Sequence, residues 1–179
     1  LYNTLDVIRM TALEKNDEKT AELLECLAHQ LRYVMGEHTD CIVLRDELQA
    51  LREYFVIMKV RYEGRIRLSI QVSDEDAQLY IPKLLLQPVV ENAIRHGLRE
   101  KNGEGTVAIR VERKEDYLEI VVMDDGVGME EDQVRIMQKT LDDPEIGKAD
   151  ANGRLSVGMK NVYDRIKLNC GKEYGFGIE

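Results

Sequence analysis

The sequence is poor in cysteine and lacks the long apolar run of a membrane span. Its three cysteines, Cys26, Cys41 and Cys170, are widely spaced and form no Cys-x-x-Cys pair. This pattern excludes a disulfide framework and a zinc site of the usual spacing, and it predicts reduced thiols. No apolar stretch approaches the roughly 20 residues of a membrane span, and no signal peptide opens the chain. We therefore expect a cytoplasmic segment that is not embedded in a membrane.

Positive charge is also scarce. The 25 lysine and arginine residues are outnumbered by 34 aspartate and glutamate residues, so the formal net charge is −9 over 179 residues. Such a balance argues against nonspecific binding to nucleic acid or to an anionic membrane, and we predict no nucleic-acid partner. Hydrophobic residues at 44% and charged residues at 33% are typical of a globular protein.

The first third of the chain has the apolar spacing of helices. One helix is already in progress at Leu1, which suggests a cut through a longer helix, and it should end near Lys15-Asn16. Asp17 is a candidate N-cap for a second helix, and Gly36 would end it. The second and third helices carry seams spaced by 3 and 4, namely Leu24, Leu27, Leu31 and Val34, then Leu44, Leu48, Leu51, Phe55, Met58 and Tyr62. We predict an antiparallel hairpin that pairs with a second copy as a homodimer; alternatively, the seams pack on each other or on the following domain.

From Gly64 onward strands alternate with helices. The sequence predicts a helix from Pro82 to about Leu98, a polar segment from Glu130 to Arg154, and a helix from about Gly158 to Cys170. Strands are expected at residues 65–72, 106–113, 117–123 and 174–178. This order predicts an α+β fold, in which a helical region (residues 1–63) precedes a two-layer α/β sandwich with a mixed sheet (residues 64–179).

The first cluster of candidate site residues lies on the helix after Pro82. On an α-helix Asn92, Arg95 and His96 would share one face at i, i+3 and i+4. An amide oxygen suits Mg²⁺ that keeps waters and also binds phosphate, and the two neighbouring side chains could meet phosphate charge. Taken alone, an asparagine on a helix is more often a solvated or capping residue, and a lone histidine is more often satisfied by local partners.

Two glycine-containing turns supply the other candidates. Asp124 ends a strand and is followed by Gly126 and Gly128, so a carboxylate there could accept a hydrogen bond from an exocyclic amine such as that of adenine. The alternative is an ordinary Asp-Gly turn. Ser156 and Gly158 open a helix whose N–H groups could receive an anion, although Ser156 also suits a plain N-cap.

Taken in order, these strings resemble the N, G1 and G2 boxes of the GHKL (Bergerat) ATP-binding fold. The chain is similar more narrowly to the LytS/YesM-type sensor histidine kinases. That resemblance rests on the strings at residues 1–5, 31–33, 47–54, 86–97, 124–129 and 158–165. It differs from the family in having Ser156 at the first glycine of the G2 box, and in ending before the family's last strand.

The resemblance implies a role for each position. Asn92 would ligate Mg²⁺, with Arg95 and His96 near the phosphates of ATP. Asp124 would bind the adenine amino group beside Gly126 and Gly128. The phosphates would be bordered by Ser156, Gly158 and Met159, behind a lid at about residues 130–155.

The resemblance also places the phosphoacceptor outside the chain. In the family this histidine precedes a Leu-Tyr-Asn string by two positions, and Leu1-Tyr2-Asn3 matches that string. His29 opens a His-Gln-Leu-Arg string that looks like the acceptor box of other histidine kinases, but no Thr-Pro follows, and we interpret it as a decoy. A cognate response regulator would receive the phosphate.

Three functions remain open at this point. A histidine kinase is favoured over an ATPase because Pro88 stands where GHKL ATPases have the general-base glutamate, and Glu91 lies about 100° round the helix from Asn92. The second is a nucleotide-binding dimerisation module without phosphotransfer. The third, a serine kinase of the anti-sigma type, fits neither the helical region nor the Leu-Tyr-Asn string.

Overall fold

A computed structural model describes residues 1–36, 39–98, 101, 103–142 and 157–178. It shows a helical hairpin beside a two-layer α/β sandwich, so the predicted α+β class is confirmed. The elements follow in this order: α1 (Tyr2–Glu14), α2 (Glu18–Met35), β1 (Cys41–Val43), α3 (Leu44–Arg61), β2 (Ile66–Gln71), η1 (Asp76–Gln78), β3 (Tyr80–Pro82), α4 (Gln87–Asn92), η2 (Ala93–Leu98), β4 (Gly105–Arg113), β5 (Leu118–Asp124), α5 (Glu131–Asp142) and α6 (Val157–Cys170).

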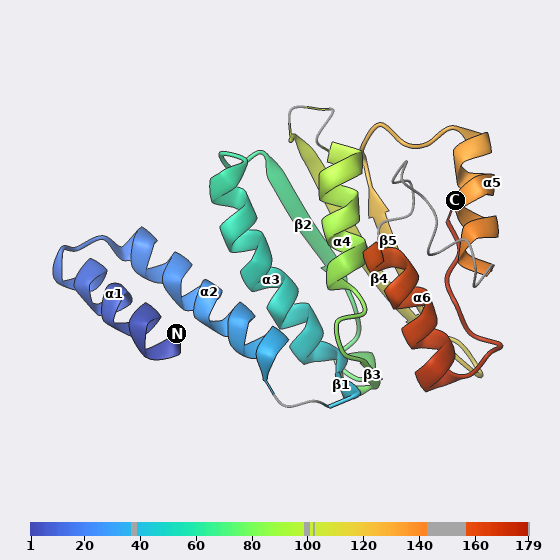
Figure 1. Ribbon diagram of the computed structural model, residues 1–179, viewed down its shortest axis with the longest axis horizontal. Coiled ribbons are helices and arrows are strands. Elements are labelled where there is room, and N and C mark those ends of the chain that lie inside the picture. Colours follow the sequence, from blue (N-terminus) through green and yellow to red (C-terminus); the bar gives the residue numbers. More distant parts are fainter. Residues whose placement is uncertain (37–38, 99–100, 102, 143–156, 179) are drawn as a thin grey trace.

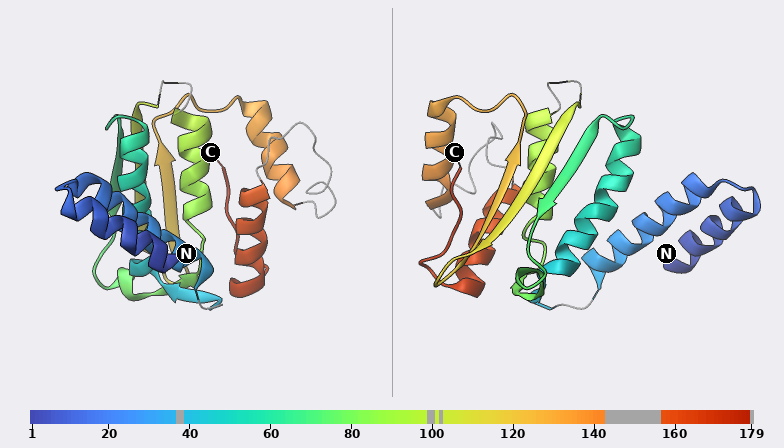
Figure 2. Two further views of the ribbon diagram at one scale, coloured as in Figure 1. Left: turned by 60° about the vertical axis from the view of Figure 1, so that its left-hand side comes forward. Right: turned by 180° about the vertical axis from the view of Figure 1, so that it is seen from behind.

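The main sheet is mixed, as the sequence predicts. Its strand order is β2-β4-β5, with β2 parallel and β5 antiparallel to β4. Helices α3, α4 and α6 cover one face, whereas the view from behind shows the strands uncovered on the other (Figures 1 and 2). The alternation of buried and exposed residues along β4 matches this arrangement, because Val107, Ile109 and Val111 all face the helices.

An N-cap lies at the turn between α1 and α2. The Asp17 carboxylate accepts hydrogen bonds from the Thr20 N–H at 3.1 Å and the Thr20 hydroxyl at 2.7 Å, as expected for an N-cap. These bonds lower the pKa of Asp17. Helices α1 and α2 extend away from the sandwich (Figure 1), and several of their apolar side chains are exposed: Val7, Ile8, Met10, Leu13, Leu27, Val34 and Met35.

The apolar seam of α3 packs within this chain, whereas the sequence predicted that it would pair with a second copy. Leu44, Leu48, Leu51 and Phe55 are buried in one core with Ile66 and the other inner residues of the sheet. The alternative reading, in which the seam packs on the following domain, is therefore the correct one for α3. The division at residues 63 and 64 stays a prediction, and the hydrophobic core crosses it.

Three predicted elements are corrected by the structure. No helix opens at Pro82, because Tyr80–Pro82 pairs antiparallel with Cys41–Val43 and α4 begins only at Gln87. The expected polar segment contains helix α5, which buries Met137 and Leu141; residues 143–156 lie outside the described residues. No strand is formed over the described residues 174–178. The ring of Phe176 instead packs against the ring of Tyr163, with 5.8 Å between the two ring centres.

Candidate functional site

The first predicted cluster lies where α4 becomes a π-helix. Asn92 is the last residue of α4 and is half-buried, while Arg95 and His96 are exposed on η2. The regular α-helix predicted here is interrupted, because residues 93–98 form a π-helix, whose i→i+5 hydrogen bonds change the angles between Asn92, Arg95 and His96 from those of an α-helix. Such turns occur frequently at functional sites.

The π-helix meets the turn that follows β5. The N–H of Val127 donates to the carbonyl of Gly97 at 3.1 Å. A Cβ on Gly97 would lie 2.2 Å from Oδ1 of Asp124, and one on Gly126 would lie 2.5 Å from the Gly97 backbone. The approach of backbone to backbone requires glycine at position 126, whereas a Cβ at position 97 would displace the Asp124 side chain. The structure thus brings the first and second sequence clusters together.

The two adjacent aspartates of this turn make different hydrogen bonds. Asp125 holds the turn to β4, since its Oδ1 accepts the N–H of Thr106 at 2.8 Å and its own N–H donates to the carbonyl of Thr106 at 3.3 Å. Asp124 is exposed, and its Oδ1 accepts the Gly126 N–H at 2.9 Å. Sequence reasoning did not find the role of Asp125, because it depends on which residue of β4 lies opposite. Gly128 has φ +70°, as a turn glycine allows.

The third cluster lies at the start of α6. Gly158 is half-buried in the first turn, the Met159 side chain is buried, and Ser156 lies outside the described residues. The first turn of α6 carries no acidic residue, so the positive end of the helix dipole is left without a local counter-charge from that turn. Lys160 donates to the carbonyl of Leu141 at 3.0 Å and thereby joins α6 to α5.

A cleft of about 210 Å³ lies between α4 and α6. It is lined from α4 by Gln87, Pro88 and Glu91, from α6 by Gly158, Asn161, Val162 and Arg165, and also by Val34 and Leu84. Gly158 is the one predicted site residue among these. Pro88, which stands at the position of the ATPase glutamate, lines this cleft. Its side chain cannot accept a proton.

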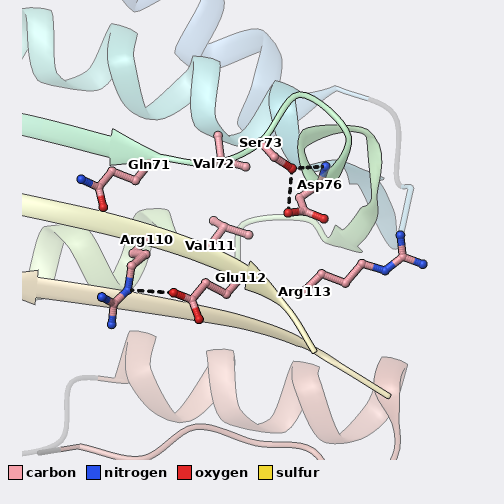
Figure 3. Close-up of a pocket in the computed structure, with 8 residues that line it drawn as sticks. All are labelled: Gln71, Val72, Ser73, Asp76, Arg110, Val111, Glu112 and Arg113. Atoms are coloured by element: carbon pink, nitrogen blue, oxygen red, sulfur yellow. Dashed lines mark hydrogen bonds and ion pairs between the residues drawn. The ribbon is translucent and has the colours of Figure 1, made fainter. Parts of the chain in front are cut away.

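A larger cleft of about 500 Å³ lies at the opposite end of the sheet. It is bordered by Gln71 to Ser73 and Arg110 to Arg113, together with Asp76. Because β5 runs antiparallel to β4, Asp124 pairs with Val107 and is remote from this end. Figure 3 shows the guanidinium of Arg110 paired with the carboxylate of Glu112, and the carboxylate of Asp76 accepting a hydrogen bond from the Ser73 hydroxyl. This cleft does not belong to the predicted site.

Asn92 suits a metal ion that the protein binds together with phosphate and water. Within the described residues no group of three or more histidine, cysteine or acidic side chains could hold a metal ion. A single amide oxygen suits Mg²⁺, which keeps several waters and binds phosphate oxygens alongside one or two protein ligands. Asn92 therefore fits the predicted ion, and the other ligands would come from phosphate and water.

His29 lies on α2, away from the three clusters in sequence and element. Its Nδ1 is 3.2 Å from Oε1 of Glu53 on α3, and its side chain is 44% exposed. This contact joins two helices of the first region.

Comparison with known proteins assigns the chain to a family. Residues 81–174 match the family described as histidine kinase-, DNA gyrase B-, and HSP90-like ATPase, and residues 1–66 match the family described as histidine kinase. The chain belongs to the histidine kinase-, DNA gyrase B- and HSP90-like ATPase family. The predicted GHKL fold and the similarity to LytS/YesM-type sensor histidine kinases are thereby confirmed, and the expectation of ATP holds at the level of the family.

Several relatives resemble this family member over nearly its whole length. Sensor histidine kinase YesM of Bacillus subtilis is 30% identical over 99% of this chain and 28% of its own length. The putative uncharacterized protein YwpD of the same organism is 33% identical over 97% and 59% respectively. Sensor protein kinase HptS of Staphylococcus aureus is 25% identical over 96% and 31%. The chain therefore spans less than two thirds of each of these relatives.

Among solved structures, the histidine kinase domain of the Erythrobacter litoralis EL346 blue-light activated histidine kinase matches with a TM-score of 0.44. It is 17% identical, and the match covers 90% of this chain and 72% of that one. A likeness of this size adds nothing to the family assignment. Within the described residues of this family member, no helix has the length and hydropathy of a membrane span.

Proposed function

We propose that the chain is the ATP-binding catalytic core of a two-component sensor histidine kinase. In this proposal it passes the γ-phosphate of ATP to a histidine upstream of Leu1, and from there to a response-regulator aspartate. The observation that carries the proposal is the contact between Gly97 and the Asp124–Val127 turn. It places the helix with Asn92 and the strand end with Asp124 side by side, as one nucleotide site would require.

Each predicted residue has a role in this proposal. Asn92 holds Mg²⁺, which neutralises phosphate charge, while Arg95 and His96 face the phosphates from η2. Asp124 accepts the adenine amino group, and Gly126 and Gly128 shape the wall beside it. Gly158 and Met159, at the start of α6, border the phosphates, and the proposal gives the same role to Ser156, which precedes that helix in the sequence.

The proposal also includes a homodimer, a cognate response regulator and a cytoplasmic location. The exposed apolar side chains of α1 and α2 support the homodimer, because a second copy could bury them. A kinase is supported over a hydrolase by Pro88, which cannot activate water.

Transfer of label from ATP tests the proposed function. The 179-residue chain and a version extended upstream through the predicted histidine are each incubated with γ-labelled ATP and Mg²⁺. We expect label only on the extended form, because the acceptor precedes Leu1. Equal labelling of both forms would contradict this and would favour His29 as the acceptor. Nucleotide binding without labelling of either form would favour the alternative, a nucleotide-binding dimerisation module.

Replacement of Asp124 by asparagine tests the adenine contact. The carboxylate only accepts hydrogen bonds, whereas an amide also donates and can pair with the O6 of guanine. We expect the ratio of ADP to GDP affinity to fall about tenfold, measured by calorimetry in the presence of Mg²⁺. Asp74→Asn, in the loop after β2, is the control. An unchanged ratio in Asp124→Asn would remove this residue from the site.

A further inference from the structure

Glu47 is a buried carboxylate that lies against the start of α4. It belongs to α3 and is 1% exposed. Its Oε2 accepts the N–H of Leu84 at 3.0 Å, and its Oε1 accepts those of Leu86 at 2.9 Å and Gln87 at 3.4 Å. The N-cap residue of α4 makes no side-chain cap of its own. Glu47 therefore supplies, from another helix, an acceptor for the N–H groups at the start of α4.

Helix α2 reaches the same carboxylate through Tyr33. The Tyr33 hydroxyl donates to Oε2 of Glu47 and accepts the N–H of Leu84 at 3.2 Å. Burial and, next, the charge of Glu47 raise the pKa of Tyr33, so that the hydroxyl keeps its proton. The ammonium group of Lys83 lies 5.3 Å from the centre of the Tyr33 ring. One hydroxyl thus connects the first helical hairpin to the loop before α4.

Helix α6 holds this loop from the other side. Arg165 donates to the carbonyls of Lys83 and Leu84. Leu84 has φ +58°, a backbone conformation that a leucine adopts only when its surroundings impose it. Its N–H is fixed by the helical region and its carbonyl by α6. We call Tyr33, Glu47, residues 83–87 and Arg165 the Glu47 network.

We propose that Glu47 and Tyr33 are positioning residues that couple the helical region to α4, the helix that carries Asn92. This inference rests on the proposed function, because α4 then holds part of the nucleotide site. A displacement of α2 against α3 alters the bond between Tyr33 and Glu47, and with it the support of the first turn of α4. By reciprocity, nucleotide bound at Asn92 changes the surroundings of the Tyr33 hydroxyl.

Two pairs of variants separate coupling from simple packing. Tyr33→Phe removes one hydroxyl and keeps the ring, and Glu47→Gln places an amide donor where backbone donors converge. Tyr2→Phe is the control for the first, since the Tyr2 hydroxyl also joins two helices, by donating to the carbonyl of Leu31 at 3.2 Å. Glu53→Gln is the control for the second. Glu53 also joins α3 to α2, through His29, and its described bonds do not involve α4.

Amide hydrogen exchange gives the first readout, and it needs no nucleotide. We expect exchange at the three amides bonded to Glu47 to accelerate about tenfold in Glu47→Gln and severalfold in Tyr33→Phe, with α1 unchanged. Both controls should leave these amides unchanged. The proposal is overturned if Tyr33→Phe leaves them unchanged, or if the controls accelerate them equally. Tyr33→Phe decides the matter should Glu47→Gln fail to fold.

Nucleotide affinity gives the second readout, with a fluorescent ATP analogue and Mg²⁺ as the probe. We expect Tyr33→Phe to weaken binding about threefold to tenfold, and the double variant to be no weaker than Glu47→Gln alone, because both act through one path. Additive losses, or an affinity equal to that of the parent chain, would overturn the coupling. If the parent chain itself binds no analogue, the proposed function fails, and the exchange experiment still judges the support of α4.

Discussion

Replacement of Gly126 by alanine is expected to lower the free energy of unfolding by about 2–4 kcal/mol. The new methyl group would lie 2.5 Å from the backbone of Gly97, and a backbone cannot move aside as the end of a side chain can. Relief requires η2 to separate from the turn, which would break the bond between the Val127 N–H and the Gly97 carbonyl. Denaturant unfolding followed by circular dichroism measures the loss, and nucleotide affinity should fall with it.

Two other glycines provide graded controls. Gly128→Ala meets no atom within 4 Å but has φ +70°, so we expect a cost of about 1 kcal/mol from backbone conformation alone. Gly177→Ala meets open space and has no such φ, and it should be close to neutral. If Gly126→Ala unfolded at the same denaturant concentration as Gly177→Ala, the close approach of η2 and the turn would be refuted.

Replacement of Asn92 by alanine should abolish nucleotide binding that depends on Mg²⁺. In the proposed site this amide oxygen is the protein's own ligand to the ion, because no cluster of acidic or histidine side chains among the described residues could take its place. We expect at least about a 100-fold weaker affinity for a nonhydrolysable ATP analogue, measured by calorimetric titration with Mg²⁺. Titration with EDTA in place of Mg²⁺ should reduce the parent chain to the level of the variant.

Asn169→Ala is the matched control for this change. Asn169 is an exposed asparagine near the end of α6, and its amide donates within its own helix to the carbonyl of Arg165 at 2.9 Å. Its replacement should leave affinity unchanged. Binding by Asn92→Ala that equals that of Asn169→Ala would refute the metal assignment.

Local signals in the sequence were sufficient for much of the fold. Asp17 caps α2 because an N-cap depends on residues three positions apart, which the sequence displays directly. The alternation of Val107, Ile109 and Val111 predicts a strand with one buried face, and all three are buried. The class of fold follows from the order of such segments.

Features set by distant residues could not be predicted in this way. Pro82 suits a helix start, yet its segment pairs with Cys41–Val43, about 40 residues earlier in the chain. The α3 seam predicts an apolar contact without naming its partner, which is the sheet. Within the candidate site, the sequence indicated Asn92 and Asp124 separately. The approach of Gly97 to the turn, the anchoring by Asp125 and the cap by Glu47 depend on tertiary contacts.

The π-turn of Ala93–Leu98 has a consequence for which mutations this chain tolerates. A π-turn contains one more residue than the α-turn it replaces, so a single-residue deletion within it would leave an ordinary, well-bonded helix. That repaired helix would carry Gly97 out of reach of Asp124 and Val127. Natural variation at residues 93–98 should therefore change side chains more freely than segment length.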